Sequence, residues 1–272
     1  MITKEEKLLN GTALDKHDFS MAFTGDDVAT TKRLREAGRS GRLLNAVSAS
    51  VMVAANASLH FLERLHFDLL QRPMNHNEQR FYQLLLSGGA ARAMVARILL
   101  SRQEYRMEFV QSRCQILLGR RACATDLYAL ANALGFGATE TQVITQIVAS
   151  HSYFAAAGGS HQSFLERLFL DLIGREMELA ERKYFEQALE AGSSRDEVAL
   201  SLIDSDEYRR KLVTDCYWQF LDRLPTSDEL NAGASALKAG AAREKIILSL
   251  VSSEEYFEQA ARGASGRDTL EV

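Results

Sequence analysis

The 272-residue chain has the balance of an ordinary globular protein, with 46% hydrophobic and 25% charged residues, so widespread disorder is not expected. Two prolines among many Ala, Leu, Glu and Arg residues predict an all-α fold and argue against a large sheet protein. A net charge of −4 argues against general nucleic-acid binding, and 3 cysteines without CxxC spacing predict no disulfide framework. Because the sequence shows neither a signal-peptide core nor a membrane-spanning apolar stretch, we expect a soluble chain without a transmembrane segment.

Residues 1–60 form an N-terminal region with a polarised charge. Residues 1–30 are polar and predict an extended arm that orders on binding. Between Thr31 and Arg42 the net charge is +4, which leaves −8 for the rest of the chain. This basic segment is predicted to bind an acidic partner, or the acidic repeats of another copy, through five side chains, and the alternative is a solvated helix face: Lys32, Arg33, Arg35, Arg39 and Arg42.

Residues 43–59 follow the basic segment and read as an apolar helix. They lead directly into the first repeat, and we expect them to cap its exposed end.

The rest of the chain contains an internal duplication. Residues 61–154 and 164–257 align without a gap at an offset of 103 residues, with 34 identical pairs in 94. Each half divides again, because Arg, Gly and Tyr landmarks recur at steps of 48, 55 and 48 residues. We therefore expect two helical repeat pairs of two subrepeats each, a small, polar connector at 155–163, and a C-terminal tail at 258–272.

Each subrepeat is predicted to contain three helices. In the third subrepeat, an apolar stripe starting at Phe164 marks the first helix, and residues 179–191 form the second, closed by Gly192. A Ser194-x-x-Glu197 capping box opens the short third helix, as Thr139 and Gln142 do in the second subrepeat. Further boxes are predicted to mark the end of this third helix, at Ser101-x-x-Glu104, Asp204-x-x-Glu207 and Ser252-x-x-Glu255, and in the first and third subrepeats they begin the next long helix.

The landmark Arg and Tyr residues have two interpretations. A guanidinium can clamp a carboxylate or phosphate of a ligand, but a functional site is needed once, whereas these residues recur in all four subrepeats. We therefore favour a structural role, in which Arg bonds carbonyls at its helix end and Tyr packs between helices. The residues are Arg72, Arg120, Arg175 and Arg223, with Tyr105, Tyr153, Tyr208 and Tyr256.

No motif in the sequence indicates catalysis or cofactor binding. The six histidines show no H-x3-H or HExxH pair, and no GxSxG, GxxxxGK[ST] or GxGxxG motif is present. We expect no metal, cofactor, catalytic residue or small-molecule substrate. One alternative is an enzyme with a site in a cleft at the 155–163 junction.

A family resemblance rests on two segments of the third subrepeat. They are Phe-Leu-x-Arg-Leu-x-x-Asp-Leu-x-Gly-Arg at 164–175 and the Ser194 to Arg209 region, which ends in Ser-x-Glu-Tyr-Arg. This pattern resembles a bacterial repeat family of unknown function, common in cell-surface, secreted and S-layer-associated proteins, and is distantly similar to the linker domain of phycobilisome rod linkers. The resemblance implies a non-catalytic helical module that joins other proteins. The chain departs from the pattern at Gln71 and Asp222, where the family has glycine, and it lacks the fuller phycobilisome-linker pattern.

These observations predict a non-enzymatic helical-repeat scaffold that mediates protein–protein assembly, with partner subunits or with itself. The bacterial cytoplasm is the expected location. The alternative is a surface- or matrix-associated glycan-binding module exported without an N-terminal signal.

Overall fold

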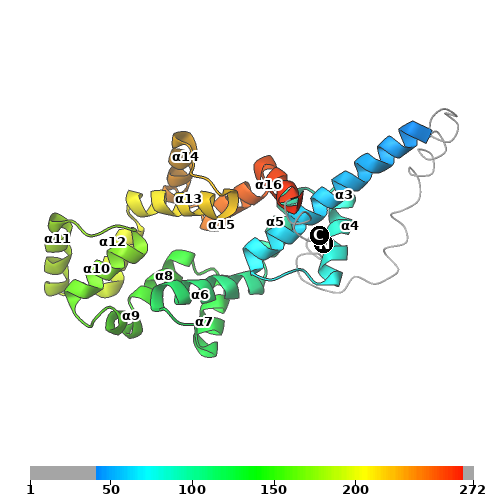
Figure 1. Cartoon of the computed structure of the whole chain (residues 1–272). Helices are drawn as coiled ribbons and strands as arrows, with labels where there is room; N and C mark the ends of the chain where they lie inside the picture. The colour runs from blue at the N-terminus through cyan, green and yellow to red at the C-terminus, as the bar shows by residue number, and fades with distance from the viewer. Residues whose placement is uncertain (1–40, 266–272) are drawn as a thin grey trace, which may run out of the picture. The chain divides into compact units, whose positions relative to one another are not determined.

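The computed structural model describes the backbone of residues 41–265 and the side chains of residues 52–262 (Figure 1). Within this part, fourteen helices are joined by turns and no strand occurs, which confirms the predicted all-α repeat fold. Contacts divide the chain into two parts, with the boundary between residues 56 and 57, inside α3 (Gly41–Leu70). The expected connector at 155–163 lies inside the second part, where it holds a helix end, a turn and the next helix start.

The four subrepeats follow one another with the expected three helices each. The first contains α3 (Gly41–Leu70), α4 (His76–Ser87) and α5 (Arg92–Leu100), and the second α6 (Gln103–Leu118), α7 (Ala124–Gly135) and α8 (Glu140–Val148). After the short α9 (His151–Ala156), the third contains α10 (His161–Leu172), α11 (Leu179–Glu190) and α12 (Arg195–Ile203). The fourth contains α13 (Asp206–Leu221), α14 (Ser227–Lys238) and α15 (Arg243–Val251), and α16 (Glu254–Ser265) follows it.

The predicted apolar helix at 43–59 is the N-terminal portion of α3, continuous with the first helix of the first subrepeat. In the part whose side chains are described, Met52 and Val53 are two-thirds exposed.

Helix starts confirm some of the predicted capping boxes and correct others. The Thr139–Gln142 and Ser194–Glu197 boxes are present in α8 and α12. The boxes predicted for Glu104 and Glu207 are wrong, because α6 begins one residue later, after Arg102, and Ser205 caps α13. The box predicted for Glu255 is also wrong, because Ser253, and not Ser252, accepts the hydrogen bond from the Tyr256 amide. These three glutamates bind arginines instead, as described below.

The hydrophobic core consists of two clusters that pair subrepeats across the two sequence halves. One cluster joins the second and third subrepeats and includes Val110, Ile147, Phe164 and Leu202. The other joins the first and fourth subrepeats and includes Phe61, Leu99, Phe220 and Ile247. Each half of the duplication therefore contributes one subrepeat to each core.

The third helices of the subrepeats form the contacts between these partners. Helix α8 packs against α12, and α5 packs against α15 (Figure 1). The offset of 103 residues converts α5 into α12 and α8 into α15. The two cores are thus two versions of the same interface.

Candidate functional site

Of the five predicted partner-binding residues, four lie outside the described residues, namely Lys32, Arg33, Arg35 and Arg39. For Arg42 only the helical backbone of α3 is described.

Three landmark arginines each bind two glutamates. Arg72, Arg175 and Arg223 make paired hydrogen bonds of 2.7–2.9 Å with the glutamate six residues on, namely Glu78, Glu181 and Glu229. Each also bonds the glutamate thirty-two residues on, namely Glu104, Glu207 and Glu255. The arginine therefore ties the end of a first helix to the start of the second helix and to the helix that follows the third.

The hydrogen bonds of this arginine stabilise its own subrepeat, which is the structural role that its fourfold recurrence predicts. In each subrepeat the guanidinium also donates to the carbonyl of the next residue, as Arg223 does to Leu224. Hydrogen bonds from Arg223 lower the pKa of Glu229 to about 2. Arg120 is the exception: it bonds only the Arg121 carbonyl, because Asp126 and Ser152 occupy the two glutamate positions.

Two of the landmark tyrosines make equivalent contacts at two junctions between helices. The internal junction joins α9 to α10, and the terminal junction joins α16 to α3. At the internal junction Tyr153 is fully buried, meets Phe164 edge to face, and donates to the Asp171 carboxylate at 2.8 Å. The Arg167 guanidinium lies 4.9 Å from the centre of the Tyr153 ring and donates to the Leu117 carbonyl.

The same set of contacts closes the terminal junction between α16 and α3. Tyr256 meets Phe61 edge to face and donates to Asp68 at 2.7 Å, while Arg64 lies over its ring and donates to the Phe220 carbonyl. The internal junction is bridged by the short turn at 157–160, but the terminal one joins helices that are 188 residues apart at their contact. The terminal junction therefore depends entirely on side-chain contacts.

A buried ion pair lies between the two halves. Glu140, at the start of α8, and Arg243, at the start of α15, approach to 3.5 Å, and each side chain is 11% exposed. The 103-residue offset converts one of these positions into the other, so equivalent sites carry opposite charges. Burial raises the pKa of Glu140 to about 7, although Arg243 opposes the shift.

Polar groups without hydrogen-bond partners lie within this pair and beside it. Among the described residues, the buried Tyr105 hydroxyl, the Nε of Arg113 and Oε1 of Glu140 have no hydrogen-bond partner. Burial lowers the pKa of Arg113, and the neighbouring Arg243 lowers it further. Such groups are costly to bury.

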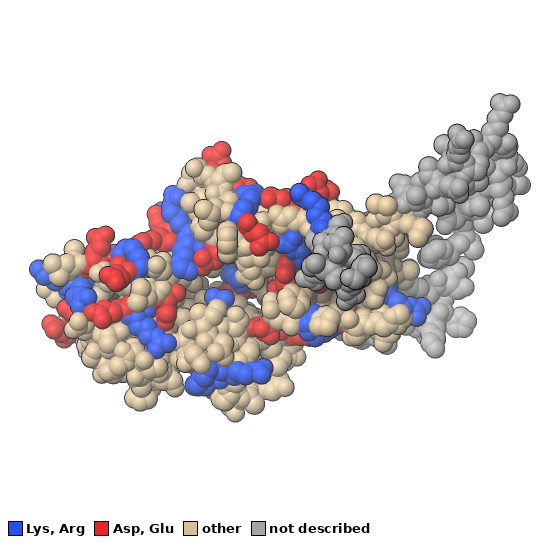
Figure 2. Space-filling view, in the orientation of Figure 1, with Lys and Arg blue, Asp and Glu red and all other residues tan. Residues whose placement is uncertain are grey.

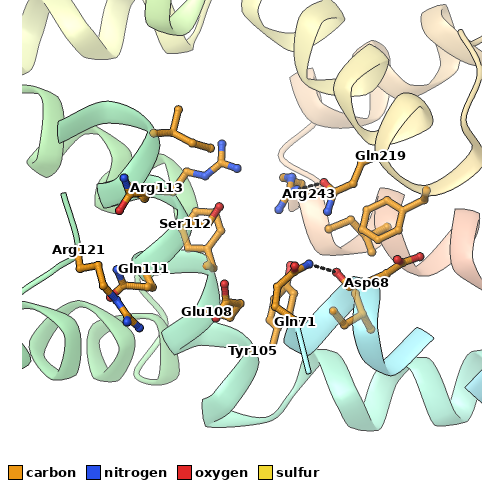
Figure 3. A pocket seen from close by; sticks show the side chains of 16 residues that line it. Asp68, Gln71, Tyr105, Glu108, Gln111, Ser112, Arg113, Arg121, Gln219 and Arg243 are labelled. Carbon is orange, nitrogen blue, oxygen red and sulfur yellow. Dashed lines mark hydrogen bonds between the residues drawn. The ribbon is translucent and has the colours of Figure 1, made fainter. Parts of the chain in front are cut away.

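An open cavity of about 480 Å³ lies beside these groups, lined by α3, α6, α13 and α15. Arg113 from α6 and Arg243 from α15 face one another across its upper part in Figure 3. Polar side chains line the rest together with the rings of Tyr105, Phe109 and Phe220: Asp68, Gln71, Glu108, Gln111, Ser112, Gln115, Arg121 and Gln219. It is the best candidate for a ligand site in the described part of the chain.

The equivalent space on the other side of the ion pair is nearly filled, with a volume of about 40 Å³. There Lys211 replaces Glu108 and Gly174 replaces Gln71. The Lys211 side chain packs over Gly174, where a Cβ would meet it at 3.1 Å, and pairs with Asp215. The cavity is thus a feature of one half only.

Neither Arg113 nor the cavity was predicted from the sequence, and Tyr105 was predicted to have only the structural role of its repeat. One signal was present, because a duplicated position that holds Glu140 in one half and Arg243 in the other suggests contact between the halves. A cavity, however, depends on which subrepeats pair.

The remaining surface gives no stronger candidate. Figure 2 shows acidic and basic side chains interspersed over the face in view. Among the described residues no cluster of His, Cys, Asp or Glu has the arrangement of a metal site. No described helix is both long enough and apolar enough for a bilayer span.

Residues 144–212 match the family model described as a domain of unknown function, DUF4214. This finding supports the expected domain-of-unknown-function family for that segment. The comparisons with curated proteins and with solved structures gave no match. The matched segment runs from α8 into α13, so it contains the internal junction whose contacts the terminal junction repeats.

Proposed function

We propose that the chain is a non-enzymatic helical-repeat scaffold that assembles with other copies of itself through the terminal junction. The observation that carries this proposal is the repetition of the Tyr153–Asp171 junction by Tyr256 and Asp68, which no short connector joins. Contacts that close one chain on itself can form equally between two chains, because the contacting groups are the same.

The terminal junction is also suited to exchange. Helix α16 is the last described helix, so it can leave α3 without unfolding an element that follows it in the described chain. Its outer contacts are exposed: Arg92 on α5 pairs with Glu254, whose side chain is 65% exposed, and stacks on Phe257. Within the described part of α16, Tyr256 and Ala260 are the buried side chains that opening must expose.

Locking the junction within one chain tests the proposal. In a Cys123→Ser background, Arg92→Cys and Glu254→Cys are joined by a short bismaleimide, and molar mass is measured by light scattering across a concentration series. The matched control joins His151→Cys to Arg195→Cys, the equivalent positions of the internal junction. We expect the unlocked chain and the control to form dimers or larger species and the terminally locked chain to stay monomeric.

Two outcomes would contradict the proposal. One is an unlocked chain that stays monomeric at every concentration and does not capture a differently tagged copy. The other is a terminally locked chain that assembles like the control.

The basic segment from Lys32 to Arg42 is proposed to steer this assembly toward the acidic remainder of another copy. Deleting residues 1–42 should slow association and reduce its salt dependence. Association of the deleted chain at the same rate, with the same salt dependence, would remove this part of the proposal.

We place the protein in the bacterial cytoplasm, in keeping with an assembly scaffold rather than an exported module. Fractionation of the host separates the two locations, because recovery in the envelope or medium would favour a surface-associated module.

A further inference from the structure

We propose that the cavity between α3, α6, α13 and α15 binds a small hydroxylated monocarboxylate, held by Arg113 and the hydroxyl of Tyr105. This inference rests on the cavity alone and does not depend on the proposed assembly role.

The charged groups around Arg113 favour a ligand with a single negative charge. The two acids that act on it, Glu140 and Asp215, are already paired with Arg243 and Lys211. Arg113 therefore offers a guanidinium without a carboxylate of its own, and a planar carboxylate matches its paired donors. A phosphate dianion fits less well, because its second charge would lie near Glu108, and the other two lining cations, Arg121 and Arg243, already act on Glu108 and Glu140.

The Tyr105 hydroxyl supplies a second donor for the same group. Tyr105 is 6% exposed, it lines the cavity, and its oxygen has no partner among the described residues. Burial raises its pKa far above the usual range, so the hydroxyl stays protonated and can donate. A bound carboxylate would satisfy both Tyr105 and Arg113.

The remainder of the lining favours hydroxyl groups on the ligand. The amides of Gln71, Gln111 and Gln219 and the hydroxyl of Ser112 each donate and accept, as hydroxyl recognition requires. The rings of Phe109 and Phe220 supply apolar surface for the carbon chain.

The cavity has features that packing alone does not favour. The equivalent space in the other half is closed by Lys211 over Gly174, which shows that this fold can fill it. Gln71 keeps a left-handed backbone, with φ of 52°, as Asp222 does in the fourth subrepeat, where Gly119 and Gly174 occupy the same position in the other two. An uncompensated Arg113 beside a cavity that the other half fills is typical of a site maintained for binding.

Gluconate and sorbitol form a matched pair of probes, because they share a six-carbon polyol chain and differ in the carboxylate. Binding to the full chain is measured by calorimetry and by the shift in Tm, at constant ionic strength, with inorganic phosphate as a third probe. We expect gluconate to bind at millimolar concentration or tighter, and at least tenfold more tightly than sorbitol or phosphate.

Two variants locate the binding. Arg113→Gln should weaken gluconate binding at least tenfold, and Tyr105→Phe several-fold, while the exposed control Arg80→Gln should leave it unchanged. Because Arg113 has no carboxylate partner, its removal should not lower the Tm of the free chain, which separates a binding role from a structural one.

The proposal is overturned if gluconate does not bind, if sorbitol or phosphate binds as tightly, or if Arg113→Gln binds gluconate like the wild type. An Arg113→Gln chain with a lowered Tm and unchanged gluconate affinity would identify Arg113 as a packing residue.

Discussion

Tyr256 donates its hydroxyl proton to Asp68 across 188 residues of the chain, in the same geometry that Tyr153 uses toward Asp171 across 18 residues. The two hydrogen bonds are 2.7 and 2.8 Å long. The contact between α16 and α3 thus repeats the contact that α9 makes with α10. The difference in connectivity gives the two bonds different consequences when they are broken.

Tyr256→Phe and Tyr153→Phe should each lower the free energy of unfolding by about 2 kcal/mol, because each removes a hydrogen bond from a buried hydroxyl to a partly buried carboxylate. Urea unfolding measures this loss. Hydrogen exchange should distinguish the variants: the α16 amides exchange about tenfold faster in Tyr256→Phe, whereas those of α9 stay coupled to α10. Equal exchange in α9 and α16 would argue against a separately opening terminal junction.

Replacing the landmark arginines should affect stability according to their carboxylate partners. Arg175→Ala and Arg223→Ala each break bonds to two glutamates, at sites about one-third exposed, and should cost about 1–2 kcal/mol in urea unfolding. Arg120→Ala is the matched control and should change stability by less than about 0.5 kcal/mol. A comparable loss in all three variants would show that the glutamates are not the source.

Gln71→Gly should stabilise the chain by about 0.5–1 kcal/mol. Glycine adopts the left-handed backbone at this position without strain, although it gains more freedom in the unfolded chain. Gln71→Ala keeps the strain and serves as the control, with little change expected. If both variants destabilise equally, the Gln71 side chain contributes more than its backbone costs.

Glu140 should make stability depend on pH between its ordinary pKa of 4.5 and its folded pKa of about 7. In this interval the folded chain binds more protons than the unfolded chain, so the free energy of unfolding decreases as pH rises through 7. The contribution is fully present below pH 4.5 and amounts to about 3 kcal/mol. Subtracting the pH profile of Glu140→Gln isolates it, because other groups cancel, and a flat difference would contradict the shifted pKa.

Local sequence determined the elements of this protein. Helical periodicity, two prolines and the Thr139 and Ser194 capping boxes located the helices because capping and apolar spacing act within one or two turns. The fourfold recurrence of the arginines also indicated a structural role. Their partner glutamates were misread as caps, because an interaction across 32 residues has no local signature.

The tertiary structure alone decided which subrepeats pair and where the cavity lies. Similar subrepeats present similar apolar faces, so the sequence favours no pairing, whereas the packing joins the first to the fourth and the second to the third. That choice brings Glu140 to Arg243 and leaves Arg113 and Tyr105 beside an open space. Side-chain identity fixed the helices, but only the packing of distant copies placed unpartnered charge next to a cavity.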